Sequence, residues 1–408
     1  MSESQRSVSL AEHSSTRIEL EHDDERYIQE ITNQHADDQT QPPLSVTPTT
    51  QKRNMYYLQS YGHVGVVQLP SDIRIQINPK IEETQLLRML NYVKTDDPLP
   101  HLADKITLEG GNEFLDIIGY IFAEELEMVL TRGVEKGYVS ERDVTTHIRG
   151  KLDISRQLQT PRENQFHVEY ETLTRDTRIN QLILYATDIL RKMVIGSDLS
   201  RRLNTLHTRF KRNVTSVRFH PDQLDTIVLD STNGYYQTAV ELSKQIVRSI
   251  YYDGLNPGEV TAFGFLINMN ELFEEFVTNL LSDAYPEKTI VKEHNSLFEP
   301  HEGLIKPDLV IRDGTQLHLV GDVKYKQYES NSRGAPNNDY YQVIAYSDVY
   351  GSDAFLIYPG EDPVETKTVK NSNKQISLVP LEVSALSNEE FISDAQTTLQ
   401  DKLLRIVG

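Results

Sequence analysis

Two apolar runs separated by a turn dipeptide in the last third of the chain predict a hairpin of two strands. The apolar run 309–311 leads into Asp313-Gly314, a dipeptide that favours tight turns, and a second apolar run follows over 317–323. Successive side chains on a strand point to opposite faces, so Asp322 and Lys324 share one face of the second strand. The pattern therefore predicts a strand that presents an acid and a lysine side by side.

Helical periodicity flanks this hairpin on both sides. Between residues 270 and 281 apolar side chains recur with a period near 3.6, which predicts an amphipathic helix with Glu274 beside its apolar stripe. Residues 339–346 predict a second helix, on which Gln342 and Tyr346 lie one turn apart on the same face. Glu274 is placed where it could reach inward from the first of these helices.

The residues at the mouth of the hairpin suggest phosphate chemistry. Asp308 follows a proline at the start of the first strand, and Asp322 and Lys324 stand near the end of the second. Two acids and a lysine at one sheet edge suit a site where carboxylate oxygens hold Mg²⁺ and an ammonium stabilises or deprotonates the group that attacks a phosphate. An Asp-x-Lys pair also arises by chance, and most such pairs are solvated surface charges.

The hairpin geometry sets a condition on this interpretation. A flush two-residue turn at Asp313-Gly314 would place Asp308 opposite Leu319, three residues from Asp322, which is roughly 10 Å at ~3.3 Å per residue. Because a shared metal requires a closer approach, we predict an irregularity. It is either a bulge marked by Gly321 or a longer turn.

The first 52 residues differ in composition from the rest of the chain. They are rich in Ser, Gln, Thr, Asp and Glu and carry Gln41-Pro42-Pro43 near their end. Little apolar surface is available to dock the short acidic helix that could form there. We predict a mostly disordered leader over 1–52, either a passive extension or a tail that contacts a partner.

From residue 53 the pattern becomes structured. Short apolar runs predict a small β-subdomain over 53–81, and 3.6-residue periodicity predicts a mainly helical stretch over 82–250. Asp176 and Asn180 would then serve as a turn or cap residue and a first-turn residue of a helix. The helices that we expect in this stretch lie at 84–93, 112–134, 177–194 and 233–250. We therefore divide the structured part into a region over 53–261 and a C-terminal domain over 262–408.

Composition narrows the class of protein. The 408 residues predict two or three domains, and the absence of cysteine excludes disulfides and cysteine-ligated zinc. No apolar run reaches the ~18 residues of a membrane span, and no basic segment followed by an apolar one marks a secretory signal. A cytoplasmic protein without a membrane partner is expected. The chain has no Gly-x-x-x-x-Gly-Lys-[Ser/Thr] motif, so any nucleotide-driven motor would be another polypeptide.

The net charge of −20, from 41 basic and 61 acidic residues, argues against unaided binding to DNA. Two explanations reconcile it with a nuclease. A partner carries most of the DNA affinity, or the host cytoplasm is salty enough to screen charges within ~3 Å at 1 M salt.

The order of these elements resembles the PD-(D/E)XK nuclease core: a helix with Glu, a Pro-Asp strand, an Asp-x-Lys strand and a Gln-x-x-x-Tyr helix. More closely, the chain resembles the McrC family, the nuclease subunit of McrBC-type restriction systems. Further signature segments lie at 77–81, 87–92, 132–153 and 174–180, so the resemblance covers about 55–360. It implies an α/β fold, α+β overall, in which a mixed sheet flanked by helices follows the β-subdomain and the helical region.

The resemblance also assigns roles. Asp308 and Asp322 would hold Mg²⁺, with Lys324 as general base or transition-state stabiliser, Glu274 as an auxiliary acid, and Gln342 and Tyr346 as support.

Three cations outside this set have two readings each. Arg149 and Lys151 flank a glycine that permits close backbone approach to a phosphate, or they belong to a turn with solvated charges. Lys326 contacts a DNA backbone or is solvated.

The implied function is that of a Mg²⁺-dependent endonuclease subunit for double-stranded DNA. The region 53–261 would dock on a McrB-like AAA+ GTPase hexamer whose DNA-binding domain reads modified cytosine. Two alternatives stay open, a non-cleaving adaptor that stimulates the GTPase and a stand-alone nuclease of another defence system.

Overall fold

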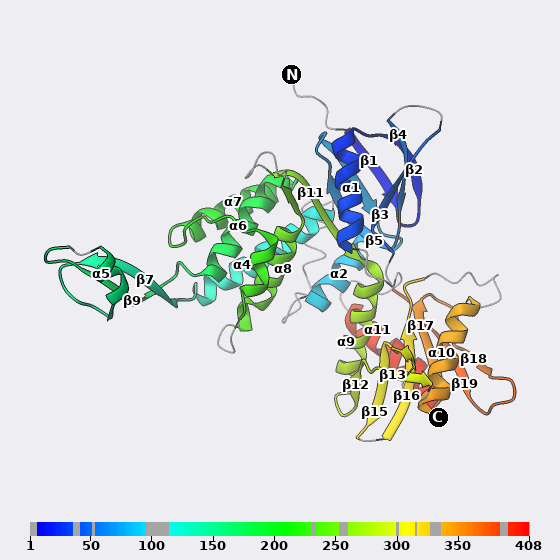
Figure 1. Ribbon diagram of the computed structural model, residues 1–408. Coiled ribbons are helices and arrows are strands. Elements are labelled where there is room, and N and C mark those ends of the chain that lie inside the picture. Colours follow the sequence, from blue (N-terminus) through cyan, green and yellow to red (C-terminus); the bar gives the residue numbers. More distant parts are fainter. Residues whose placement is uncertain are drawn as a thin grey trace. The chain divides into compact units, whose positions relative to one another are not determined.

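The computed structural model shows a mixed α/β fold that divides into two compact units, Met1–Thr107 with Leu266–Gly408, and Leu108–Phe265 (Figure 1). It describes residues 6–35, 41–50, 54–94, 114–160, 162–229, 234–252, 260–298, 302–314, 316–326, 336–383 and 391–407. The expected boundary between 261 and 262 lies close to the observed one. The expected β-subdomain, however, belongs to the same unit as the C-terminal domain. No helix in these described ranges is long and apolar enough to cross a bilayer.

The N-terminal part of the first unit is built from strands and two helices. β6 pairs in parallel with β1 and antiparallel with β5, while β4 pairs antiparallel with both β2 and β3. Helix α2 packs on α9 of the C-terminal part. The elements are β1 (Arg6–Ala11), β2 (Ser15–Glu19), α1 (His22–His35), β3 (Leu44–Pro48), β4 (Met55–Ser60), β5 (His63–Gln68), β6 (Ile73–Asn78) and α2 (Glu83–Lys94). The predicted strands within 53–81 and the helix at 84–93 are confirmed.

The prediction of a disordered leader is wrong for residues 6–35 and 41–50. Leu10, Ile18, Ile28 and Leu44 are buried there, in β1, β2, α1 and β3 respectively. Their partners are far along the chain, because β1 pairs with β6 and both β2 and β3 pair with β4. The average polarity of the segment hid single apolar positions, which become a core only when these distant strands pair.

A six-stranded mixed sheet forms the C-terminal part of the same unit, with strand order β12-β15-β16-β17-β19-β18. Its central strand β17 is buried at every position, which is typical of a parallel-paired strand covered on both faces. The strands are β12 (Thr289–Val291), β15 (Leu309–Asp313), β16 (Gln316–Val323), β17 (Ala354–Pro359), β18 (Glu365–Thr368) and β19 (Gln375–Leu381). The two-stranded ribbon β13 (Asn295–Phe298) and β14 (Glu302–Ile305) precedes β15.

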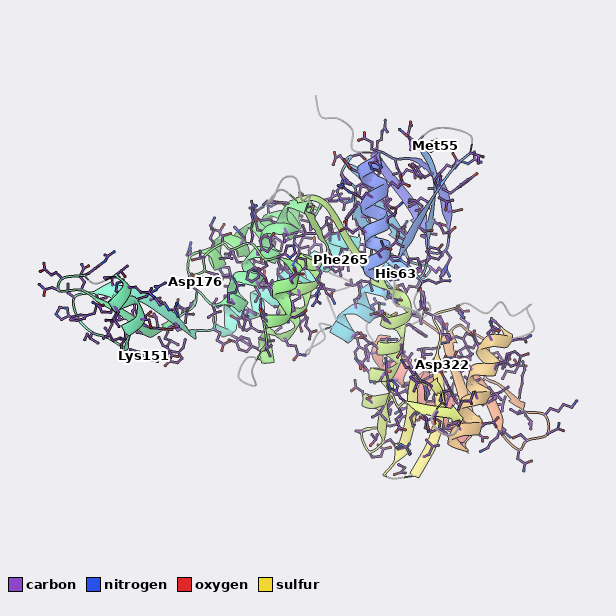
Figure 2. The ribbon with its side chains drawn as sticks, viewed as in Figure 1. Met55, His63, Lys151, Asp176, Phe265 and Asp322 are labelled. Carbon is purple, nitrogen blue, oxygen red and sulfur yellow. The ribbon has the colours of Figure 1, made fainter. Side chains whose placement is uncertain are left out.

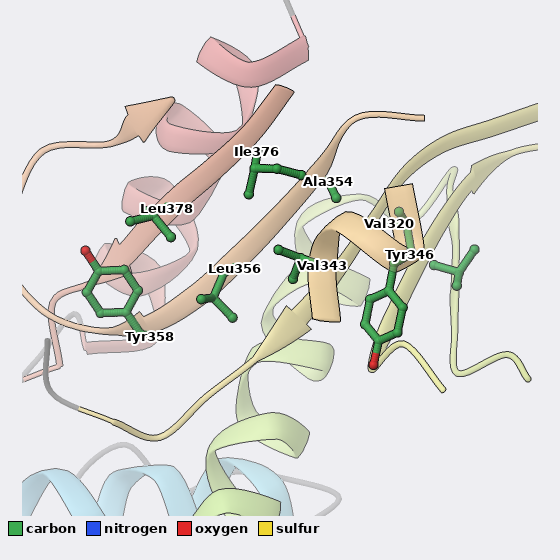
Figure 3. Close-up of a cluster of buried hydrophobic side chains, with 9 residues drawn as sticks. Val320, Val343, Tyr346, Ala354, Leu356, Tyr358, Ile376 and Leu378 are labelled. Carbon is green, nitrogen blue, oxygen red and sulfur yellow. The ribbon is translucent and has the colours of Figure 1, made fainter. Parts of the chain in front are cut away.

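Helices cover this sheet, as expected for a mixed sheet flanked by helices. α10 (Asn337–Tyr350) packs on β16 and β17, and α11 (Phe391–Val407) packs on β19 and on α9 (Met269–Ala284). Figure 3 shows the core between the sheet and α10, which consists of Val310, Val320, Val343, Tyr346, Ala354, Leu356, Tyr358, Ile376 and Leu378. Because side chains alternate along a strand, Asp322 lies on the same face of β16 as Val320, the face that α10 covers.

The second unit is mainly helical. The helices are α4 (Phe114–Arg132), α6 (Arg178–Met193), α7 (Ser197–Lys211) and α8 (Gln237–Arg248), and short 3-10 turns lie at Pro221–Thr226 and Gly234–Tyr236. Its strands are β7 (Gly137–Thr145), β8 (Lys151–Leu152), β9 (Phe166–Thr174) and β10 (Ile250–Tyr252), and β11 (Val260–Asn268) runs past the end of the unit at Phe265. The helices expected at 112–134, 177–194 and 233–250 are confirmed within a few residues. Sequence reasoning missed α7, although Leu199, Leu203, Leu206 and Phe210 lie on one buried face at helical spacing.

The long hairpin of β7 and β9 forms an arm of this unit. β7 pairs with β9 over its whole length, β8 adds two residues to β9, and α5 (Ile154–Gln159) packs on β9. Figure 1 shows this arm extending away from the helices of its own unit. We refer to residues 137–174 as the β7–β9 arm.

Asp176 and Asn180 hold the junction between the arm and α6. Thr177 is the N-cap of α6, and its hydroxyl accepts the Asn180 N–H at 3.3 Å. The buried Asn180 amide donates to the carbonyls of Arg175 at 2.7 Å and Glu135 at 3.1 Å. Asp176, labelled in Figure 2, accepts the Thr215 N–H at 2.8 Å. Both residues therefore have the structural roles that were expected, with Thr177 as the cap.

Candidate active site

The register of the β15–β16 hairpin decides which residues meet. Asp313 pairs with Gln316, so the turn lies one residue beyond the position predicted for it. Nearer the site Ile311 pairs with Leu319, and the shift between these pairs leaves His318 as an extra residue in β16. The turn shift and the bulge together supply the three-residue correction. An irregularity is therefore present, as predicted, but it is a bulge at His318 and a shifted turn, not a longer turn or a bulge at Gly321.

Gly321 does not mark the bulge, because it pairs regularly with Leu309. A Cβ at this position would instead clash with the ring of Phe355 on the neighbouring strand β17. Glycine is required at this position because the Phe355 ring occupies the space that a larger side chain would need. The suggested bulge at Gly321 is therefore wrong.

Asp308 and Asp322 are brought together by this register. Leu309 pairs with Gly321, so Asp308 comes opposite Asp322, where the charge of each carboxylate acts on the other. Asp322 is completely buried and is labelled in Figure 2. Asp308 Oδ2 also accepts the Val323 N–H at 2.9 Å. Burial, and then the charge of Asp322, raises the pKa of Asp308 to about 7, so the pair holds a proton up to neutral pH.

Lys324 completes the centre of the site. Its Nζ lies 2.6 Å from Asp322 Oδ2, and its backbone N–H donates to Ile357 O at 2.9 Å, which ties the end of the strand to β17. Burial lowers the pKa of Lys324, but the charge and hydrogen bond of Asp322 outweigh it, so the pKa is raised overall. The ammonium is therefore charged at neutral pH.

Gln342 and Tyr346 of α10 hold the other oxygen of Asp322. Gln342 Nε2 lies 2.6 Å from the Tyr346 hydroxyl and 3.4 Å from Asp322 Oδ1. The Tyr346 hydroxyl donates to Lys306 O at 3.1 Å and lies 3.5 Å from Asp322 Oδ1. Because Lys306 immediately precedes Pro307 and Asp308, these two side chains join α10 to both acidic strands.

Glu274 reaches the site from α9. Burial, and then the charge of Asp308, raises the pKa of Glu274. Its side chain forms an ion pair with Lys292, which follows β12 and also feels the charge of Asp308. Sequence reasoning missed Lys292, since one lysine after a three-residue strand carries no recognisable signal. The structure thus collects two cations and three acids around the expected centre.

Lys326 and Arg149, for which a contact with DNA or phosphate was one of two interpretations, are paired with side chains of the protein itself. Lys326 Nζ lies 3.1 Å and 3.2 Å from the two oxygens of Asp339, at the start of α10. Arg149 pairs with Asp143 at 3.1 Å, and its guanidinium stands 3.6 Å from the centre of the Tyr170 ring. Arg149 and Lys151 belong to the β7–β9 arm of the second unit.

The glycine between Arg149 and Lys151 explains their local structure. Gly150 has a φ of +69°, and a Cβ there would clash with Glu169 O. Lys151 then pairs with Glu169 in the ladder of β8 and β9. These contacts favour the turn interpretation of Arg149-Gly150-Lys151 over a phosphate-binding loop.

The donor set fits magnesium better than metals that need a full protein cage. Among the described residues no group of three or more His, Asp or Glu side chains is arranged to hold a metal ion. Mg²⁺ commonly takes one or two protein carboxylates and completes its octahedron with water and substrate phosphate. Asp308 and Asp322 supply such a pair, and a cation between them would offset the repulsion that raises the Asp308 pKa.

Comparison with known proteins identifies the family of the chain. Residues 58–359 match the family described as McrBC 5-methylcytosine restriction system component. The chain belongs to this family. The match covers β5, β6, the second unit, both acidic strands and α10, so every residue of the candidate site from Glu274 to Tyr346 lies within it.

Two relatives of this McrBC-family chain are informative. It is 21% identical over 296 residues to the type IV methyl-directed restriction enzyme EcoKMcrBC of Escherichia coli K12. The aligned residues cover 66% of this chain and 83% of that protein. A chain from the half-complex of Thermococcus gammatolerans McrB AAA+ hexamers with bound McrC matches with a TM-score of 0.70 and 19% identity. That match covers 98% of this chain and 100% of the other. Together they identify an McrC-type subunit with the fold of that chain.

Proposed function

We propose that this McrC-type chain is a DNA endonuclease subunit that hydrolyses phosphodiester bonds with Mg²⁺ held by Asp308 and Asp322. The observation that carries the proposal is the triad of Asp308, Asp322 and Lys324, assembled from two strands by a register correction. This is the arrangement expected of a PD-(D/E)XK core. An adaptor without nuclease activity has no need of a buried Asp322 beside a half-buried acid and a half-buried ammonium.

Each residue of the site has a separate role in the proposed reaction. When bound, Mg²⁺ supplies polarisation of the phosphate and activation of water for in-line attack. Lys324 is charged because Asp322 raises its pKa, so it acts as stabiliser of the negative charge that develops on the phosphate rather than as general base. Gln342 and Tyr346 fix the orientation of Asp322. Glu274 adds a further acid beside Asp308 and orients Lys292.

We further propose that the chain acts when docked on a McrB-like AAA+ GTPase hexamer that recognises modified cytosine in double-stranded DNA. The support is the likeness to a chain in a complex of McrB hexamers with McrC, the absence of a Gly-x-x-x-x-Gly-Lys-[Ser/Thr] motif, and the net charge of −20. Because an acidic chain is repelled by the phosphates of DNA, a partner that binds DNA would hold it near its substrate.

Within the expected docking region 53–261, the β7–β9 arm fits this role best. It exposes large apolar side chains, among them Tyr138, Ile148 and Leu158 at 71%, 58% and 77% of their surface. Large exposed apolar side chains gathered on one element are typical of protein-binding surfaces. We therefore assign docking on the GTPase to the arm.

The test is cleavage of cytosine-methylated plasmid by the chain together with its GTPase, GTP and Mg²⁺. We expect wild type to cut, Lys324→Met to lose about 100-fold or more of the rate, and the exposed Lys370→Met control to cut like wild type. Equal cutting by wild type and Lys324→Met would refute the assigned centre. No cutting by wild type with GTP hydrolysis still stimulated would establish the adaptor alternative. Cutting by the chain without any GTPase would establish a stand-alone nuclease.

A further inference from the structure

Glu12 is bonded to a segment that the sequence singled out and the proposed function leaves unused. Its backbone N–H donates to Asn78 O at 3.1 Å, and its Oε1 accepts the Lys80 N–H at 2.9 Å. The side chain is buried although a carboxyl group is costly to bury. Glu12 therefore fixes the stretch that follows β6, where the signature Asn78-Pro79-Lys80-Ile81 lies.

The same carboxyl group reaches the end of the strand that carries the active-site acid. The hydroxyl of Tyr325 donates to Glu12 Oε1 at 3.4 Å and accepts the backbone N–H of Ile81. Tyr325 is buried and is the residue after Lys324. Its ring packs on the ring of Phe273, with the two centroids 5.8 Å apart. Phe273 is the residue directly before Glu274 in α9. Tyr325 thus connects the signature segment to the neighbouring residue Lys324 and to α9, the helix that carries Glu274.

A second contact ties α9 to the same subdomain. The N–H of Met269, the first residue of α9, donates to Gly62 O at 2.9 Å. A Cβ on Gly62 would approach Asn270 Nδ2 to 2.9 Å, so the β4–β5 turn and the helix start are in close contact. The stretch after β16 that carries Lys324 and the helix α9 that carries Glu274 are therefore both anchored on the N-terminal β-subdomain.

We propose that Glu12 is a positioning residue that acts through Tyr325 to hold Lys324 against Asp322. A buried carboxylate that accepts hydrogen bonds from two donors restricts both of them. Here the donors are the Lys80 N–H of the signature segment and the hydroxyl of Tyr325, the residue after Lys324. The effect on DNA cleavage rests on the proposed function. The effect on the backbone of 323–326 does not.

The variants Glu12→Ala, Glu12→Gln and Tyr325→Phe test this contact. Alanine leaves both donors unpaired, glutamine keeps an oxygen that accepts from both, and phenylalanine keeps the ring on Phe273 but removes the hydroxyl. Glu21→Ala, an exposed glutamate of the same segment, serves as the matched control. The readouts are amide hydrogen exchange over 323–326 and the separate kcat and KM of DNA cleavage by the complex with the GTPase.

For Glu12→Ala and Tyr325→Phe we expect exchange at the Lys324 N–H to rise about tenfold, while exchange in α10 stays unchanged. We expect kcat to fall about tenfold with KM for DNA within about twofold. Glu12→Gln and Glu21→Ala should behave like wild type. The double variant Glu12→Ala/Tyr325→Phe should lose less than the sum of the two single variants, because both remove the shared Glu12–Tyr325 contact.

Two results would overturn the proposal. One is faster exchange only at 78–81, with 323–326 as protected as in wild type, which would confine Glu12 to the β-subdomain. The other is additive loss in the double variant, which would show that Glu12 and Tyr325 act separately. If wild type fails to cut DNA while exchange at 323–326 still depends on Glu12, the positioning contact stands and the nuclease assignment falls.

Discussion

Asp308 and Asp322 lie opposite each other on adjacent strands, and burial and the charge of Asp322 raise the pKa of Asp308. The extra residue His318 and a turn beyond Asp313 create this opposition. Because Asp322 is completely buried and Lys324 neutralises only one of the two acids, a proton stays on the pair up to about neutral pH. We therefore expect that a cation bound by the two acids would displace that proton.

The raised pKa of Asp308 makes the stability of the metal-free protein depend on pH. Its pKa of about 7 in the folded state lies above the ordinary aspartate value of 3.8, so the folded state binds more protons between these limits. The contribution is fully present below about pH 4 and is lost as pH rises through about 7. We expect Asp308→Asn to be more stable than wild type at pH 8 by at most about 4 kcal/mol, and by much less at pH 5.

Urea denaturation at pH 5, 6.5 and 8 without divalent ions measures this difference. Asp313→Asn is the matched control, because Asp313 is an exposed aspartate at the other end of the same strand. A stability difference between Asp308→Asn and wild type that does not vary with pH would contradict the shared proton.

Mg²⁺ should stabilise the protein more strongly as pH rises. Binding requires the proton on the acid pair to leave, so metal affinity falls below about pH 7. We expect 10 mM MgCl₂ (a concentration on the order of many times the Kd) to raise Tm by a few degrees at pH 8 and by about 1 °C or less at pH 6. Differential scanning fluorimetry at constant ionic strength checks this, and Asp308→Asn should show no shift at either pH.

Gly321→Ala tests the packing of the strand that holds Asp322. The added Cβ clashes with the Phe355 ring, and overpacking of this kind costs about 1–3 kcal/mol. Phe355→Leu in the same chain removes the ring atoms and should recover most of that loss relative to Phe355→Leu alone. Chemical denaturation of the four proteins forms a double-mutant cycle. Additive losses would show that the ring does not restrict this position.

Charge on the β7–β9 arm should disrupt docking on the GTPase. We expect Tyr138→Glu/Leu158→Glu to weaken binding by about 100-fold or more, because two exposed apolar side chains would carry unpaired charge in the interface. Val228→Glu is the matched control, since Val228 is 76% exposed in the same unit outside the arm. Binding is measured by analytical ultracentrifugation with GTP, and unchanged binding of the arm variant would place docking elsewhere.

Local pattern was enough to anticipate much of the candidate site. Period-two alternation placed Asp322 and Lys324 on one face, and their ion pair at 2.6 Å follows from that spacing. Helical periodicity placed Gln342 and Tyr346 one turn apart, where they are 2.6 Å from each other. These relationships depend only on residues close together in the chain.

Tertiary structure decided what depends on distant pairing. The opposition of Asp308 and Asp322 depends on the bulge at His318, and the need for Gly321 depends on Phe355 in another strand. Glu12 belongs to a stretch whose polar composition suggested disorder, yet it is buried against Tyr325, 313 residues away. Composition averages over a segment, whereas burial is set by partners that folding brings from elsewhere in the chain. The sequence by itself therefore determined the chemical groups and their spacing, and the fold decided which of them meet.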